Sequence, residues 1–126
     1  MPEISVTGEE IRTIEDYLKG YALNEKLLKL DKYERSFFAY DDRKEEYPSC
    51  DATLCRAKMF EIRHFIMGMK NGDEKLLLYY HYIRGESVER CAEMLGISRS
   101  SGFRLKKRAL IMATEILKNK GLAASE

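Results

Sequence analysis

The chain has little proline and no long hydrophobic run. Only Pro2 and Pro48 occur in 126 residues, of which 34% are charged. Few helix breakers among many Glu, Lys, Leu and Arg residues favour helix over sheet. The apolar runs are far too short to span a membrane, so we expect no membrane partner. The length suits one domain, or one small domain with a helical extension.

Cysteine and histidine are also scarce. Cys50, Cys55 and Cys91 are odd in number, and the first ten residues carry three glutamates in place of a hydrophobic leader. This pattern indicates free thiols in a reducing cytosol, so we expect a cytoplasmic protein. Cys50 and Cys55 have the spacing of a possible metal clip, but structural zinc needs four Cys or His ligands, usually in closely spaced pairs. Cys91 lies in the second half, and His64 and His81 stand alone on separate expected helices. We therefore expect no metal and no cofactor.

No catalytic constellation is visible. Acidic residues cluster near the N-terminus, at Glu9, Glu10, Glu15 and Asp16, without a nearby histidine, glycine-rich loop or nucleophile elbow. We interpret them as a solvated helix face and do not expect an enzyme.

The first half reads as an antiparallel helical hairpin over residues 1–72. Thr7-Gly8-Glu9-Glu10 has the form of a capping box, and apolar residues at helical spacing follow it. We expect one long helix or two in series, bent around Gly20, then a charged loop over 41–49. A second helix over about 51–70 completes the hairpin. This hairpin would support the rest of the protein and help to pair two copies into a homodimer.

The second half predicts three more helices, followed by a flexible tail over 119–126. The expected helices cover residues 73–84, 88–95 and 99 to about 118. Residues 1–72 carry a net charge of −2 and residues 73–126 a net charge of +3. A local basic stripe in a near-neutral protein suits a partner that touches one face.

The segment 87–110 meets the steric demands of a helix-turn-helix. Ala92 is a small residue where the second helix would approach, and Gly96 tolerates the left-handed backbone of the turn. Ile97 provides an apolar plug, and Ser98 can cap the second helix. The sequence therefore predicts an all-α fold: an N-terminal helical hairpin, then a helix-turn-helix domain over 73–118.

The outward face of the second helix predicts binding to double-stranded DNA. Arginine can bond two acceptors of guanine in the major groove, and hydroxyls can contact phosphates or base edges. Phe103 can pack on a thymine methyl group or on sugar, whereas the cations at positions 106–108 suit phosphates. The helix N-terminus at Ser98 also favours a phosphate. The candidate DNA-binding residues are Ser98, Arg99, Ser100, Ser101, Phe103, Arg104, Lys106, Lys107 and Arg108.

Gly102 departs from the motif, because a branched apolar residue usually stands there. Glycine inside a helix costs about 1 kcal/mol relative to alanine and fills little of a core. We expect either that a neighbour, Tyr80 or Tyr82, fills the gap or that the first turn of the helix is loose.

Residues 73–117 resemble region four of bacterial sigma factors. The resemblance rests on Tyr82-Ile-Arg-Gly85 and on Ala92-Glu-Met-Leu-Gly-Ile-Ser-Arg99. The continuation Arg104-Leu-Lys-Lys-Arg-Ala-Leu110 is more similar to phage and prophage late-transcription regulators of the ArpU/RinA type. The resemblance implies sequence-specific promoter binding and contact with host RNA polymerase. The alternative function is that of a sigma-like adaptor acting mainly through protein contact with polymerase.

Overall fold

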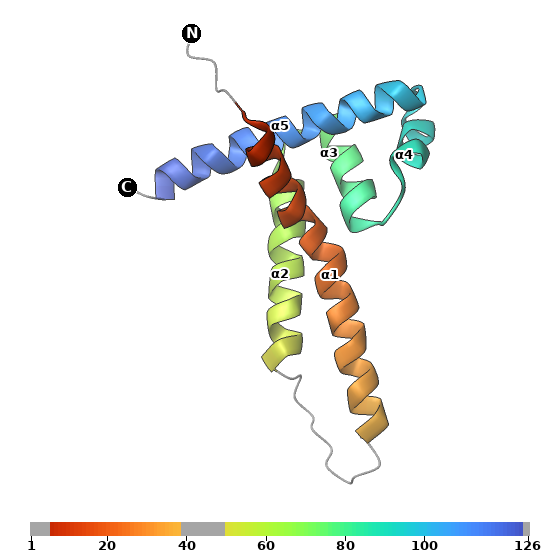
Figure 1. Ribbon diagram of the computed structural model, residues 1–126, viewed down its shortest axis with the longest axis vertical. Coiled ribbons are helices and arrows are strands. Elements are labelled where there is room, and N and C mark those ends of the chain that lie inside the picture. The colour runs from red at the N-terminus through yellow and green to blue at the C-terminus, as the bar shows by residue number, and fades with distance from the viewer. Residues whose placement is uncertain (1–5, 39–49, 125–126) are drawn as a thin grey trace.

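The computed structural model describes residues 6–38 and 50–124, and all regular secondary structure within them is helical (Figure 1). The predicted all-α class is thereby confirmed. The expected loop over residues 41–49 lies outside the described residues. The elements are α1 (Gly8–Phe38), α2 (Cys50–Met67), α3 (Asp73–Leu78), the π-helical turn η1 (Tyr79–Ile83), α4 (Val88–Leu95) and α5 (Arg99–Ala124).

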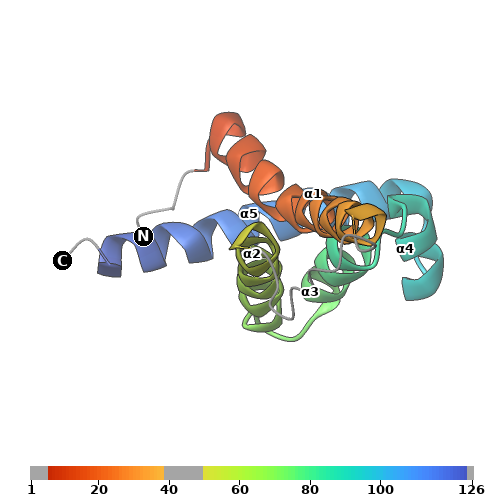
Figure 2. The same ribbon diagram turned by 90° about the horizontal axis from the view of Figure 1, so that it is seen from below.

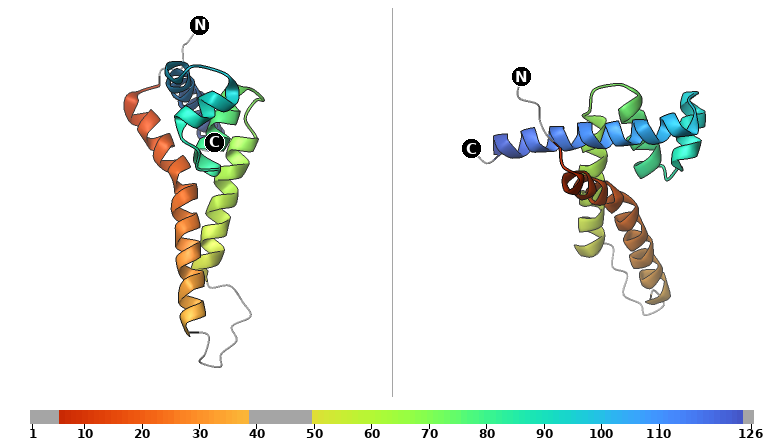
Figure 3. Two further views of the ribbon diagram at one scale, coloured as in Figure 1. Left: turned by 90° about the vertical axis from the view of Figure 1, so that its right-hand side faces the viewer. Right: turned by 45° about the horizontal axis from the view of Figure 1, so that its top comes forward.

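Helix α1 is continuous and begins at the predicted capping box. The Thr7 amide donates to the Glu10 carboxylate, and the Glu10 amide donates to the Thr7 hydroxyl, both at 3.1 Å. These two bonds satisfy backbone donors that the first turn of a helix leaves unpaired. Gly20, where a bend was expected, lies within this single helix, which curves along its length (Figure 3).

Helices α1 and α2 lie side by side and antiparallel, as the hairpin prediction required (Figures 1 and 3). Gly20 allows the close contact between them, because a Cβ at this position would lie only 3.3 Å from Ile62 Cδ1. Helix α5 runs across one end of the hairpin and extends beyond it on both sides (Figure 2).

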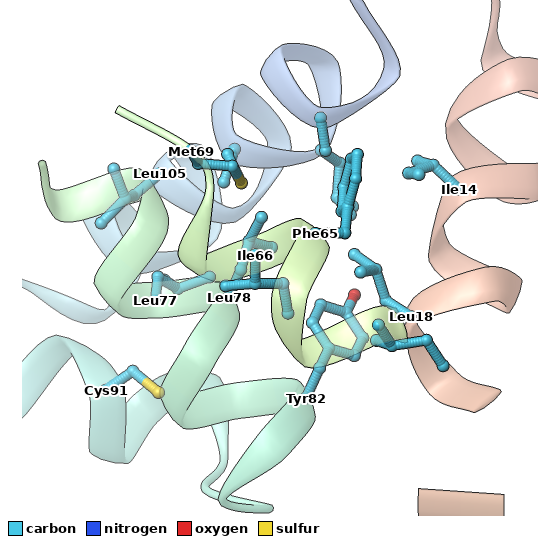
Figure 4. Close-up of a cluster of buried hydrophobic side chains, with 14 residues drawn as sticks. Ile14, Leu18, Phe65, Ile66, Met69, Leu77, Leu78, Tyr82, Cys91 and Leu105 are labelled. Carbon is cyan, nitrogen blue, oxygen red and sulfur yellow. The ribbon is translucent and has the colours of Figure 1, made fainter. Parts of the chain in front are cut away.

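A single hydrophobic core joins the two halves of the chain (Figure 4). Its buried side chains come from α1, α2, α3, η1, α4 and α5, and include Ile14, Leu18, Ile62, Ile66, Leu77, Leu78, Tyr82, Cys91, Leu105 and Ala109. The expected boundary between residues 72 and 73 therefore does not separate two cores. Because the hairpin and the second half share buried surface, a displacement of one is opposed by the packing of the other.

The helix expected over 73–84 changes from α-helical to π-helical hydrogen bonding halfway along. Its α-helical part ends at Leu78, and η1 follows, with the Arg84 amide donating to the Tyr79 carbonyl at 3.1 Å. A π-helical turn holds more residues than an α-helical one and so re-aims the side chains that follow. Here it accompanies a buried Tyr82, drawn beside Leu18 of α1 in Figure 4.

Helix α5 extends farther than expected. The expected end near residue 118 was too early, because the backbone stays helical to Ala124 and residues 119–124 continue α5. These residues are mostly good helix formers, and the single glycine among them costs only about 1 kcal/mol.

Candidate nucleic-acid interface

The turn between α4 and α5 has the local geometry predicted for it. The Ser87 hydroxyl accepts the Arg90 amide at 3.1 Å and caps α4. Gly96 ends α4 with a left-handed φ of 71°, a conformation that glycine adopts without steric cost. The Ser98 hydroxyl then accepts the Ser101 amide at 3.2 Å and caps α5. These caps fix where each of the two helices begins.

Gly102 is the contact point between α4 and α5. It is buried, and a Cβ built on it would lie 2.9 Å from the Ala92 Cβ and 3.6 Å from Val88. The expectation of a gap filled by Tyr80 or Tyr82, or of a loose first turn, was wrong. The glycine leaves no gap, because α4 comes close enough to occupy the space of the missing side chain.

The exposed face of α5 gathers five of the candidate DNA-binding residues: Ser100, Phe103, Arg104, Lys107 and Arg108. Steps of three and four residues place them along one side of the helix. This side faces away from buried Leu105 and Ala109. Phe103 is 44% exposed, so a large aromatic ring lies among the cations in contact with water.

Three cations of this face have no acidic partner in the part of the chain that the structure describes. Among the described residues, no carboxylate lies within 4.0 Å of the charged nitrogens of Arg104, Lys107 or Arg108. Three positive charges within five residues, without a carboxylate partner among the described residues, make this part of α5 locally electropositive.

Arg99 lies at the edge of the face and is held by two neighbours. Its guanidinium group lies 3.6 Å from the Glu89 carboxylate and 5.9 Å from the centre of the Phe103 ring. Both charged side chains are largely exposed, so the ion pair contributes little and can be exchanged for an external anion.

Two candidate serines act within the turn. The Ser98 hydroxyl donates to the Ser101 hydroxyl at 2.9 Å in addition to capping the helix. Ser98 is exposed and Ser101 is half-buried. Of the two, Ser98 is the better placed to meet a ligand at the N-terminus of α5.

Lys106 does not join the exposed face. Its ammonium group lies 3.1 Å from the Glu15 carboxylate of α1, and only 24% of its side chain is exposed. The spacing along the helix indicates that Lys106 lies nearer the buried side than its basic neighbours do. It directly follows buried Leu105 and stands three positions before buried Ala109. The identity of the partner, 91 positions away in the chain, has no local signal.

Glu15 is the centre of a polar cluster that sequence reasoning missed. Besides Lys106, it accepts a hydrogen bond of 2.7 Å from the Tyr82 hydroxyl. Burial alone would raise the pKa of Glu15, but the hydrogen bonds from Tyr82 and Lys106 and the charges of Lys106 and Lys19 outweigh it and lower the pKa. Burial, together with the bond and charge of Glu15, raises the pKa of Tyr82. The cluster therefore holds an ionised Glu15 and a neutral Tyr82 at neutral pH.

A second ion pair links α1 to α5 at a more exposed place. Lys118 lies 2.9 Å from the Glu10 carboxylate, with 38% and 32% of the two side chains exposed. The hydrogen bond from Lys118, followed by those from Thr7, lowers the pKa of Glu10. Two acidic residues of α1 thus each contact a lysine of α5.

A cleft of modest size lies near this cluster. It has a volume of about 230 Å³ and lies between α1 and η1, lined by residues that include Lys19, Tyr21, His81 and Arg84.

Within residues 6–38 and 50–124, no three His, Cys, Asp or Glu side chains converge to hold a metal ion. In the same ranges, no helix combines the length and apolar character that crossing a membrane requires.

No protein-family model, curated protein or solved structure matches the chain.

Proposed function

We propose that this protein is a sequence-specific, double-stranded DNA-binding transcription regulator in which α4 and α5 form a helix-turn-helix. The observation that carries the proposal is the exposed α5 face, where Arg104, Lys107 and Arg108 have no acidic partner among the described residues. An α-helix fits the major groove, where each base pair presents its own pattern of donors and acceptors.

The residues near the start of α5 are suited to reading bases. In a helix-turn-helix, side chains from the N-terminal part of the second helix contact base edges. Ser100 and Arg104 are one turn apart on the exposed face. Arg104 can donate two hydrogen bonds to guanine, and Phe103 offers an apolar surface to a thymine methyl group.

The residues that follow are suited to phosphates. Lys107 and Arg108 lie farther along α5, where a helix in the groove passes the DNA backbone. The capped N-terminus of α5, with exposed Ser98, offers a second place for a phosphate, since amide groups and the helix dipole point toward it. Contacts of this kind fix the position of the helix without reading sequence.

The resemblance to sigma region four and to ArpU/RinA-type regulators supports a role at promoters, in a phage or prophage setting. The region-four resemblance covers residues 73–117, which form α3, η1, α4 and the greater part of α5. We include host RNA polymerase as a partner on this ground alone. One recognition helix reads only a few base pairs, which favours a protein that acts as a homodimer.

Selection from a random duplex DNA library at physiological salt, followed by sequencing of the retained duplexes, tests the proposal. We expect an enriched motif. A two-fold repeat with half-sites about ten base pairs apart would indicate a dimer. Absence of any enriched motif would overturn the proposal and favour the adaptor function, which a pull-down with RNA polymerase would then examine.

A further inference from the structure

The Glu15 cluster joins three elements that are far apart in the sequence. Glu15 comes from α1, Tyr82 from η1 and Lys106 from α5. Glu15 lies 2.7 Å from the Tyr82 hydroxyl and 3.1 Å from the Lys106 ammonium group, and its other oxygen lies 3.9 Å from Lys19 of its own helix. Tyr82 and Lys106 reach the same oxygen, Oε2 of Glu15. One carboxylate therefore fixes two side chains at the seam between the hairpin and the candidate DNA-binding half.

The cluster acts on the part of α5 that carries the DNA-facing residues. Lys106 lies between Arg104 and Lys107 in the sequence but points to another side of the helix. A rotation or shift of α5 relative to α1 would stretch the contact of Lys106 with Glu15. The ion pair therefore resists the motions that would change how the exposed face meets a groove.

The cluster also decides how many cations that face can present. A lysine has a long, flexible side chain, and a free Lys106 would add a mobile positive charge beside the face. Phosphate contacts of this kind strengthen binding to every DNA sequence alike. With Glu15 ionised and half-buried beside it, Lys106 is engaged inside the protein.

On this basis, and resting on the proposed function, we propose that Glu15 is a positioning residue for DNA recognition. It holds α5 against the N-terminal hairpin through Lys106 and Tyr82, and it keeps Lys106 away from DNA phosphates. Glu15 itself touches no DNA. Its effect is to raise the preference for the correct sequence over other DNA.

Glu15→Gln is the informative variant, and Glu10→Gln is its matched control. In Glu15→Gln the side-chain amide oxygen can still accept from Tyr82, but the charge that holds Lys106 is gone. Glu10→Gln also removes one negative charge from α1 and breaks an ion pair with α5. That ion pair is with Lys118, in the C-terminal part of α5 and far along the helix from Lys106. A third protein, Glu15→Gln with Lys106→Gln, separates lost positioning from the release of a lysine.

The measurement is the affinity of each full-length protein for two duplexes, at several salt concentrations. The first duplex is the sequence most enriched by the wild-type protein in the library selection, and the second is a scrambled duplex of equal length and composition. Unfolding in urea is followed in parallel, and all binding is measured where every variant is fully folded. A merely structural role would lower stability but leave the ratio of the two affinities unchanged.

For Glu15→Gln we expect the ratio of specific to scrambled affinity to fall by about threefold to tenfold. This range corresponds to the interaction energies commonly measured between residues in direct contact. We also expect steeper salt dependence on the scrambled duplex, by up to about 0.9 in log–log slope, the value for one added phosphate contact. The double variant should lose the extra slope but keep a lowered ratio. Glu10→Gln should match the wild type.

Two results would overturn the inference. If the wild type prefers its motif and Glu15→Gln keeps the same ratio and slope, the positioning role is wrong while the proposed function stands. If Glu10→Gln lowers the ratio as much as Glu15→Gln, the effect is one of general charge and not of this cluster. A wild-type protein without any sequence preference would remove the proposed function itself, and the positioning role with it.

Discussion

Replacing Gly102 by alanine tests how closely α4 and α5 are packed. In an exposed helix interior, this change stabilises by about 1 kcal/mol. Here the new methyl group would lie 2.9 Å from the Ala92 Cβ, whereas carbon atoms in contact are normally about 3.5–4.0 Å apart. The two helices must therefore separate by several tenths of an ångström at least.

The expected magnitude combines two opposing effects. Overfilling a packed core costs about 1–3 kcal/mol, and the better helix propensity of alanine returns about 1 kcal/mol. We expect Gly102→Ala to lower the free energy of unfolding by about 0–2 kcal/mol. Urea unfolding at 25 °C, followed by circular dichroism, measures the difference from the shift in midpoint at constant m-value.

Two controls sharpen the test. Gly8→Ala at the start of α1 meets no atom within 4 Å and should be neutral or stabilising by a few tenths of a kcal/mol. The double variant Ala92→Gly with Gly102→Ala moves the methyl group from α4 to α5 and removes the clash. It should be more stable than the sum of the single changes by about 1–3 kcal/mol. Stabilisation by Gly102→Ala equal to that of Gly8→Ala, with additive single changes, would refute the close packing.

Three further outcomes are expected. Arg104→Ala should lower the binding free energy by about 1–3 kcal/mol on the selected duplex and change little on scrambled DNA. Lys107→Ala should weaken binding to both duplexes and reduce the salt slope by about 1. Equal losses of affinity on all sequences from Arg104→Ala would contradict a contact of Arg104 with bases. Ser98→Ala should lower unfolding stability by about 0.5–2 kcal/mol through loss of the α5 cap, and unchanged stability would exclude that cap. The pKa of folded Glu15 is lowered from its ordinary value of 4.5, so its contribution to stability is complete above that value and is lost as pH falls through the folded pKa. Glu15→Gln should flatten the fall in urea-unfolding stability on the acid side, and an unchanged slope there would contradict the assignment.

Features with local causes could be predicted from the sequence. The capping box at Thr7 and the caps at Ser87 and Ser98 depend on residues within one turn, and the structure contains all three. The left-handed turn at Gly96 has the same kind of cause. Helical periodicity placed the hairpin and the second-half helices, because it reports directly which face of each helix is buried.

Features that depend on tertiary contacts could not be predicted. The motif suggested a void at Gly102, since only the structure shows how near Ala92 comes. Lys106 was grouped with its basic neighbours because charge clustering in a sequence does not say which partner each cation meets. The acidic pattern around its partner, Glu15, predicts a solvated helix face, yet Glu15 is half-buried and accepts a hydrogen bond from Tyr82.

The π-helical turn η1 and the shared core are also features that the sequence alone could not predict. A π-helical turn differs from an α-helical one by a single residue, and the apolar pattern of 73–84 fits either. The boundary after residue 72 rested on a change in charge and on a turn signal. Neither reports that side chains from both sides pack together.

The most direct test of the central claim compares two triple variants of equal charge in binding to the selected duplex. One changes Arg104, Lys107 and Arg108 to glutamine, and the other changes Lys32, Arg56 and Arg63, exposed cations of α1 and α2. We expect the α5 variant to lose sequence preference and to show a salt slope smaller by about 1.8, the value for the two phosphate contacts of Lys107 and Arg108. The hairpin variant should retain both preference and slope. Equal weakening by the two variants, or full binding by the α5 variant, would contradict the account.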